Sequence, residues 1–266
     1  MQTILETARA GKPLDGIKII DSHSHMGDYF AFYIPDPSAD GMVRLMDRVG
    51  IDTACITPHM ASCGSDYREG NDMVMESMKR HPGRFLGYCT INPNYPEEIK
   101  EELKRCFDVR GFMGIKLHPF CHGVEIDYPG YIPVFEFADE NRIPVLFHTT
   151  GKSDIQYIEY LAETYKNAYF LMGHSGFGIR GQEYAMTAIN RHDNIYGDIA
   201  ISFTYECNVE WMVNSVGSKK ILYGSDMPFF DPRPAVGRVA LADLTDEQKQ
   251  DIFYNNLYGI IRHLNI

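Results

Sequence analysis

Eight short apolar runs recur along the 266-residue sequence, and helical stretches separate them. The apolar runs span 17–20, 53–57, 85–90, 112–117, 144–148, 168–174, 195–198 and 221–226. The helical stretches span 39–49, 70–80, 96–107, 131–141, 154–166, 181–191, 205–216 and 246–264, after a short helix within 1–16. Strands that alternate with helices form a parallel sheet. Eight such units in about 250 residues have the size of a closed barrel, so we predict a (β/α)8 TIM barrel with a single domain over residues 1–266.

An open, doubly wound sheet is the alternative arrangement of the same elements. That fold usually carries a glycine-rich phosphate loop after its first strand. Here the first apolar run is followed by Asp21-Ser22-His23-Ser24-His25. We see no Pro/Gly/Ser-rich linker and no repeat at the level of the sequence. These features favour the closed barrel.

Composition limits the classes of function. Hydrophobic residues make up 44% and charged residues 23% of the chain, as in an ordinary globular protein. The net charge of −11 argues against a nucleic-acid partner, which requires a basic face. No run approaches the ~20 apolar residues of a membrane helix, and the start lacks signal-peptide features. Six cysteines without a C-x-x-C pair fit reduced thiols. We therefore expect a cytoplasmic protein without a membrane partner.

Polar residues suited to catalysis stand at or just after the ends of most of these runs. They are His23 and His25 at the first, His59 at the second, Lys116 and His118 at the fourth, His148 at the fifth, His174 at the sixth, Asp198 at the seventh and Asp226 at the eighth. The carboxyl ends of all barrel strands lie on one face, where barrel enzymes place their active sites. We therefore expect these side chains to share one site.

Four of these residues form a candidate metal site. His23 and His25 are two apart, so on a strand they point the same way. Barrel closure makes the first and eighth strands neighbours, and the fifth lies opposite, which lets His148 and Asp226 join them. Three imidazoles and a carboxylate suit Zn²⁺. Asp226 could also accept a proton from metal-bound water. The ordinary alternatives are two surface histidines and, for Asp226, a turn residue before Pro228.

The remaining polar residues are candidates for substrate contact or proton transfer. We expect His174 to act as an acid or base beside the metal, and Lys116 to hold a substrate carboxylate. His118, Asp198 and Arg180 are further candidate substrate-binding residues. The alternatives are a core histidine bonded to backbone for His174 and a structural ion pair for Lys116.

Five motifs, taken in their order along the chain, resemble those of a known family. They are His23-Ser24-His25, Gly114-Ile115-Lys116-Leu117-His118-Pro119, His148, Gly173-His174-Ser175-Gly176 and Ser225-Asp226-Met227-Pro228. In this order they resemble the amidohydrolase superfamily, and within it amidohydrolase family 2, which includes aminocarboxymuconate-semialdehyde decarboxylase. The resemblance implies one Zn²⁺ or Mn²⁺ ion held by His23, His25, His148 and Asp226, with His174 as a catalytic residue. Lys116 departs from the decarboxylases and is similar to the carbamylated lysine of two-metal relatives.

Two reactions and one non-enzymatic role fit these residues. The favoured expectation is hydrolysis of an amide, lactone or ester-like bond in a small molecule by metal-activated water. The alternative is non-oxidative decarboxylation of an aromatic or unsaturated acid, with Lys116, Arg180 or Arg233 holding the carboxylate. A metal-binding scaffold without catalysis is the third possibility, and retention of His174 and Asp198 speaks against it.

Aromatic residues cluster in the segments after the first and eighth runs. They are Tyr29, Phe30, Phe32, Tyr33, Phe229 and Phe230. Because the two strands are neighbours in a barrel, these rings could wall one side of the site and contact a planar substrate. Packing among the loops, or a homodimer contact, is the alternative use of the same rings.

Overall fold

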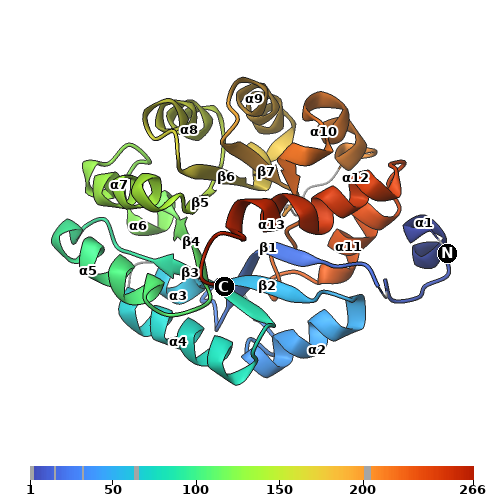
Figure 1. Cartoon of the computed structure of the whole chain (residues 1–266), viewed down its shortest axis with the longest axis horizontal. Helices are drawn as coiled ribbons and strands as arrows, with labels where there is room; N and C mark the ends of the chain where they lie inside the picture. The colour runs from blue at the N-terminus through green and yellow to red at the C-terminus, as the bar shows by residue number, and fades with distance from the viewer. Residues whose placement is uncertain (1–2, 15, 32, 63–65, 201–204) are drawn as a thin grey trace.

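The computed structural model, which describes residues 3–14, 16–31, 33–62, 66–200 and 205–266, contains eight parallel strands that pair in chain order. The strands are β1 (Ile20–Met26), β2 (Thr53–Pro58), β3 (Phe85–Thr90), β4 (Phe112–Leu117), β5 (Pro144–His148), β6 (Tyr169–Gly173), β7 (Ile195–Asp198) and β8 (Ile221–Leu222). Backbone bonds close the ring: Ser22 N–H donates to Tyr223 O (2.8 Å) and Asp226 N–H to His23 O (2.9 Å). The expected (β/α)8 barrel is confirmed (Figure 1).

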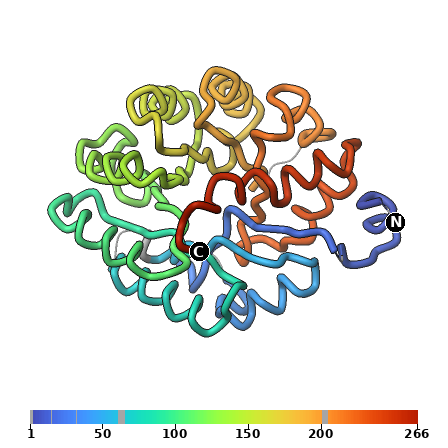
Figure 2. Tube along the Cα trace, in the orientation of Figure 1, coloured from blue at the N-terminus to red at the C-terminus, as the bar shows by residue number. Residues whose placement is uncertain are grey.

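Helices surround this ring of strands, and the chain passes once around it (Figure 2). They are α1 (Ile4–Arg9), α2 (Ala39–Val49), α3 (His59–Ser62), α4 (Tyr67–Arg80), α5 (Pro96–Phe107), α6 (Pro119–His122), α7 (Ile132–Asn141), α8 (Lys152–Thr164), α9 (Gly178–Arg191), α10 (Asn208–Val216), α11 (Pro232–Ala240), α12 (Asp246–Gln250) and α13 (Asn256–Ile261). Among the described residues, no helix combines the length and apolar character needed to cross a bilayer.

Helix α2 illustrates how local sequence sets these elements. The Ser38 side chain accepts a hydrogen bond from Gly41 N–H (3.1 Å) and caps the amino end. Gly50 ends the helix at φ 81°, in the left-handed region that glycine adopts readily. Met42 and Met46 face the barrel and are buried. Burial of this one apolar face fixes the helix on the outside of the strands.

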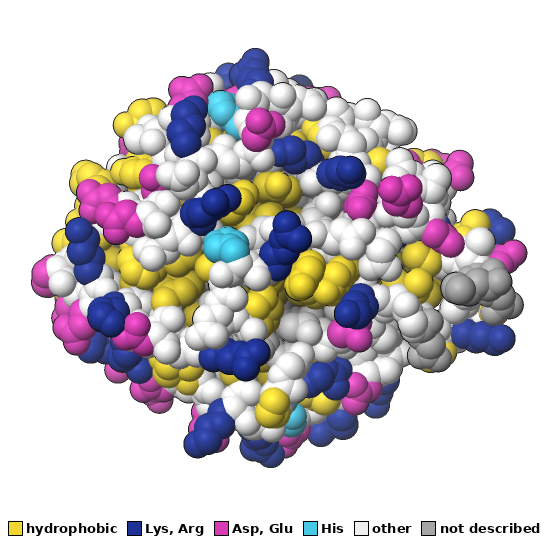
Figure 3. Space-filling view, viewed as in Figure 1, with side chains coloured by type: hydrophobic (Ala, Val, Ile, Leu, Met, Phe, Trp, Pro, Cys, Tyr) yellow, Lys and Arg dark blue, Asp and Glu magenta, His cyan; other side chains and the backbone are white. Residues whose placement is uncertain are grey.

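A separate apolar cluster fills the end of the barrel at which the strands begin. One residue from each strand except β7 contributes to it, together with three residues of α13: Ile20, Cys55, Tyr88, Met113, Leu146, Leu171, Leu222, Leu257, Ile260 and Ile261. In Figure 1, α13 lies in front of the ring of strands. The face in Figure 3 is therefore the one opposite the carboxyl ends, and Lys and Arg side chains lie around its middle. Because α13 closes this end, a site inside the barrel must open at the other end.

The structure differs from the sequence-based expectations in several places. Strand β1 begins at Ile20, so His23 and His25 lie within the strand, and the eighth strand is regular only over Ile221–Leu222. The expected helix over 246–264 is interrupted by a π-helical turn at Asp251–Asn255. Helix α11 was not expected, although Asp231 as N-cap and Pro232 in the first turn are its sequence signals.

The role of α13 predicts the effect of truncating its buried side chain. Ile261 is fully buried, whereas the next residue, Arg262, is exposed. We expect Ile261→Ala to lower the free energy of unfolding by about 2–5 kcal/mol, because it leaves a cavity under the barrel. Urea denaturation measures this loss, with Arg262→Ala as the control. Equal stability of the two variants would contradict the packing described here.

Candidate active site

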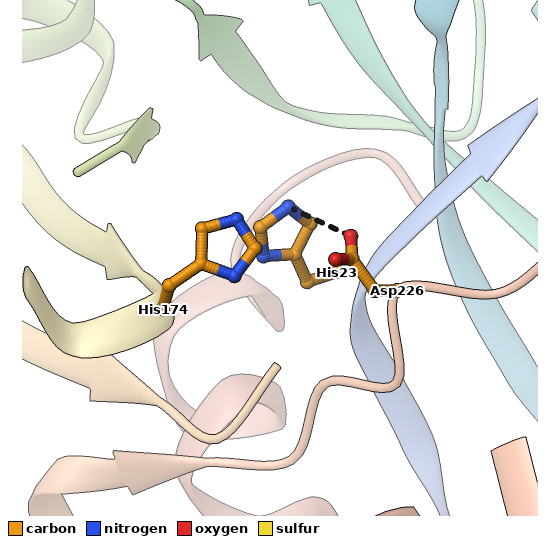
Figure 4. Close-up of side chains that lie close together, drawn as sticks. All are labelled: His23, His174 and Asp226. Carbon is orange, nitrogen blue, oxygen red and sulfur yellow. Dashed lines mark ion pairs between the residues drawn. The ribbon is translucent and has the colours of Figure 1, made fainter. Parts of the chain in front are cut away.

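A group of buried polar side chains lies at the carboxyl ends of the strands. His23 and His25 project from β1, His174 follows β6 and Asp226 follows β8. Ligand atoms of His23, His174 and Asp226 all lie within 4.8 Å of one another (Figure 4). Asp226 Oδ1 is 2.9 Å from His25 Nε2 and 3.6 Å from His23 Nε2. One carboxylate therefore faces two imidazoles of the H-x-H motif.

Lys116 of β4 reaches the same point from inside the barrel. Its Nζ lies 2.9 Å from His23 Nε2, and the side chain is 1% exposed. Burial lowers the pKa of Lys116 to about 8, although Asp226 and Asp198 oppose this effect. The sequence prediction that Lys116 belongs to the site agrees with this position. The substrate contact expected of it stays a prediction.

Asp198 lies on the opposite side of the His23 ring. Its Oδ2 is 2.7 Å from His23 Nδ1, and its Oδ1 accepts from the backbone N–H groups of His174 (2.7 Å) and Ala200 (3.1 Å). The residue is 1% exposed, and burial raises its pKa to about 6. Both oxygens thus have protein partners, and the substrate contact expected of Asp198 stays a prediction.

His148 and His118 extend the cluster along β5 and β4. His148 Nδ1 is 3.1 Å from His174 Nε2. The His118 ring stacks on His148 with centroids 4.0 Å apart, and His118 Nδ1 accepts from Cys121 N–H (3.4 Å) at the start of α6. Burial holds the pKa of both imidazoles well below the usual value. Lys116 and the neighbouring imidazoles lower the two pKa values further.

Aromatic rings line the site next to His25. Phe229 stacks on His25 (centroids 4.3 Å apart), and Tyr29 packs against Phe229 at 5.3 Å. His59 contacts His25 edge-on at 4.8 Å. Phe30 and Tyr33 are instead 75% and 85% exposed, Phe230 is 43% exposed, and Phe32 lies outside the described residues. Of the six aromatic residues expected to form a wall, Tyr29 and Phe229 stand beside the cluster.

Neither arginine candidate is bonded to the cluster in the described part of the chain. Arg180 is exposed in the first turn of α9. Within the described part of the chain, no hydrogen bond or ion pair joins it to the residues above. Arg233 forms an ion pair with Asp231 at the start of α11. A substrate role for Arg180 stays a prediction.

Asp21 is a buried residue next to the site that the sequence reasoning missed. It is fully buried in β1, accepts from Ser225 N–H (3.0 Å) and His23 N–H (3.1 Å), and bonds the Ser225 hydroxyl. Burial raises its pKa to about 7. It ties the H-x-H motif to the segment before Asp226. Its signal in the sequence was a carboxylate directly after the first apolar run and two residues before His23.

Backbone conformation also distinguishes the site. His174 and Asp226 have φ values of 65° and 64°, in the left-handed region that non-glycine residues rarely adopt. Such strain persists only where neighbouring contacts impose it, and it concentrates at functional sites. No pattern of residue types predicts these two angles.

The residues present fit a divalent metal. Burial lowers the pKa of His23 and His25, so these imidazoles are neutral at physiological pH and can each offer a lone pair. Contacts with His25, His23 and His174 help to hold the pKa of Asp226 well below its usual range, against the effect of burial. Among the described residues, His25 Nδ1, the ring nitrogen that does not face Asp226, is buried without a hydrogen-bond partner. Neutral imidazoles and an ionised carboxylate are the donors that zinc-type sites use.

Comparison with known proteins identifies the family. The sequence matches the family model described as amidohydrolase over residues 20–257. The chain belongs to the amidohydrolase family. The resemblance inferred from the motifs is thereby confirmed.

Several relatives of this amidohydrolase-family chain are decarboxylases. Gamma-resorcylate decarboxylase of Rhizobium radiobacter is 26% identical over 124 residues, which cover 41% of this chain and 38% of that enzyme. The 2-amino-3-carboxymuconate-6-semialdehyde decarboxylase of Dictyostelium discoideum is 28% identical over 78 residues, 29% of this chain and 22% of that enzyme. The matched segments thus span less than half of either curated relative.

A solved structure shows the same fold. The 5-carboxyvanillate decarboxylase of Novosphingobium aromaticivorans, crystallised with manganese and a nitrobenzoic acid, superposes with a TM-score of 0.74 at 17% identity. The superposition covers 94% of this chain and 97% of that one. At this identity the likeness establishes the fold of the amidohydrolase-family chain.

The donor set predicts tight binding of a divalent metal. We expect the purified protein to hold about one equivalent of Zn²⁺ or Mn²⁺, and His23→Ala to lose it, because the variant removes a lone pair at the centre of the group. Elemental analysis after dialysis measures the metal. His263→Ala, which changes an exposed histidine, is the control. Unchanged metal content in His23→Ala would contradict the site.

The buried imidazoles also predict how stability depends on pH. Burial lowers the pKa of His59 to about 2 and of His122 to about 4, and it lowers those of His23, His25, His118 and His148 too. The unfolded chain therefore takes up more protons below pH 6.5, so the stability that these neutral imidazoles contribute is lost as pH falls. The raised pKa values of the Asp21 and Asp198 carboxyls have the opposite effect on stability between pH 3.8 and about 7. These two carboxyls are outnumbered by the six imidazoles, so we expect the effect of the imidazoles to dominate.

We therefore expect the metal-free protein to unfold at lower urea concentration at pH 5.5 than at pH 7.5. Circular dichroism during urea titration at the two pH values checks this. A midpoint that is equal or higher at pH 5.5 would mean that the imidazoles are not held neutral in the folded state.

Proposed function

We propose that this chain is a metal-dependent decarboxylase that removes CO₂ non-oxidatively from a small aromatic or unsaturated carboxylic acid. The observation that carries the proposal is the position of His174, an imidazole within 4.8 Å of both His23 and Asp226. Decarboxylation needs a proton delivered to carbon, and an imidazole beside the metal ligands can deliver it. The named relatives support this reaction better than the hydrolysis that the sequence alone favoured.

The metal in this proposal is held by His23, His25, His148 and Asp226. Zn²⁺ and Mn²⁺ both accept such a donor set, and a related decarboxylase was crystallised with manganese. A bound divalent ion supplies positive charge that attracts and orients an anionic substrate. Asp226 contributes its ionised carboxylate beside both His23 and His25.

His174 supplies the proton in the chemical step. Its Nδ1 donates to Ala200 O, so Nε2 is the nitrogen left to face His148 and the centre of the site. From the protonated imidazole, Nε2 gives its proton to the carbon that bears the carboxylate. The bond from that carbon to the carboxylate then breaks, its electron pair stays with the ring or alkene, and CO₂ leaves. The net reaction consumes one proton.

The walls of the site fit the substrate class. Phe229 and Tyr29 offer ring faces next to His25, against which a planar substrate can stack. Lys116 is the cation inside the cluster, and a buried ammonium attracts an anionic group strongly. A planar ring that bears a carboxylate satisfies both features.

Substitution of His174 tests the proposal. We expect the manganese-loaded protein to release CO₂ from one of a panel of hydroxybenzoates, and His174→Asn to lower kcat by roughly 10²–10⁴-fold, because proton transfer is lost. The metal content should stay at the parent level. His192→Asn, which changes a histidine that faces Glu159 on the outer surface, is the control.

Two outcomes would contradict this function. CO₂ release by His174→Asn at the parent rate would remove His174 from the reaction. Turnover of esters or lactones, without CO₂ release from any carboxylate in the panel, would instead support hydrolysis. In that case Lys116 would be the first residue to examine for a carbamate that joins two metals.

A further inference from the structure

A single carboxylate contacts both imidazoles that the proposed function uses most. Asp198 Oδ2 bonds the His23 side chain, and Asp198 Oδ1 bonds the His174 backbone N–H. The same Oδ1 accepts from Ala200 N–H, and Ala200 O accepts from His174 Nδ1. Asp198 is therefore joined to His174 twice, once directly and once through Ala200.

These partners fix which ring nitrogen of each histidine carries the proton. An ionised carboxylate and a carbonyl oxygen only accept hydrogen bonds. His23 must therefore donate from Nδ1 to Asp198, and His174 must donate from Nδ1 to Ala200. In both rings the lone pair is then on Nε2. This is the nitrogen of His23 that faces Asp226, at 3.6 Å.

Lys116 gives an independent indication of the same tautomer. Its ammonium group can only donate, and Nζ lies 2.9 Å from His23 Nε2. The His23 ring is thus held between an acceptor at Nδ1 and a donor at Nε2. Both contacts favour the form with the proton on Nδ1, and the shorter bond to the Asp198 carboxylate (2.7 Å) is the stronger of the two.

We propose that Asp198 is a positioning residue that holds the lone pair of His23 on Nε2, directed at the metal site, and keeps His174 Nδ1 bonded to Ala200, which leaves His174 Nε2 to take up and deliver the proton. It is buried and both oxygens are bonded, so a substrate could reach it only by breaking these bonds. Outer partners of metal-binding histidines commonly act in this way. The bond to His174 N–H also holds this residue at its left-handed φ of 65°.

The variant Asp198→Asn separates this role from simple packing, because it keeps the shape of the side chain. The backbone N–H groups of His174 and Ala200 require an acceptor, so the Asn oxygen faces them. The Asn NH₂ group then faces His23 Nδ1 and can only donate. A donor then faces Nδ1, so His23 places its proton on Nε2 and the Lys116 contact at that nitrogen gives way. The proton on Nε2 blocks the lone pair needed by a metal.

Two measurements test the proposal on the zinc-loaded protein. In ¹⁵N NMR spectra of the parent at pH 8, we expect protons on Nδ1 of both His23 and His174. In chelator competition, we expect Asp198→Asn to bind Zn²⁺ roughly 10–100-fold more weakly, and its zinc-free form to carry the His23 proton on Nε2. Glu102→Gln is the matched control. It changes a fully buried carboxylate of α5 that is bonded to Asn71 and Arg105.

The proposal rests on the metal site of the proposed function but not on its reaction, and neither measurement depends on turnover. A proton on Nε2 of His23 in the zinc-loaded parent would overturn it without any variant, even if Asp198→Asn fails to fold. So would an Asp198→Asn protein that binds Zn²⁺ as tightly as Glu102→Gln. If the NMR and zinc-binding results are as expected but the parent protein releases no CO₂, the decarboxylase function is wrong and the positioning role of Asp198 stands.

Discussion

The seam between β1 and the segment after β8 is the constraint on which the site depends. Asp21 accepts from Ser225 and from His23 N–H, and backbone bonds join Ser22 to Tyr223 and Asp226 to His23. These contacts close the ring of strands. They also bring the H-x-H motif to Asp226 across two hundred positions of the chain. Closure of the barrel and assembly of the site therefore depend on the same contacts.

Burial then determines the chemistry of the assembled side chains. Removing water lowers the pKa of His23, His25, His118 and His148, so they stay neutral and can act as ligands. Against the effect of burial, His174 and the hydrogen bond from His25 hold the pKa of Asp226 well below its usual range. A compact group of neutral donors around one carboxylate is costly to bury unless a cation compensates it. Lys116 supplies one positive charge at this point, and a divalent metal would supply more.

Much of the fold and of the site could be predicted from the sequence, because both depend on repeated patterns. Eight apolar runs with helices between them predicted the barrel, and polar residues at their ends predicted the shared face. What the sequence could not give were contacts set by tertiary geometry. The three bonds of Asp198, the stacking of His118 on His148 and the left-handed backbone of His174 all depend on neighbours distant in the chain. Arg180, chosen for its charge near a strand end, lies exposed on α9.

We infer that this buried group at the carboxyl ends of the strands binds a divalent metal. Anomalous scattering at the manganese or zinc absorption edge, from crystals of the metal-loaded protein, tests it most directly. We expect one strong peak at about 2.0–2.2 Å from the donor atoms of His23 and Asp226. A loaded protein with no peak there, or with its metal bound elsewhere on the barrel, would contradict the account.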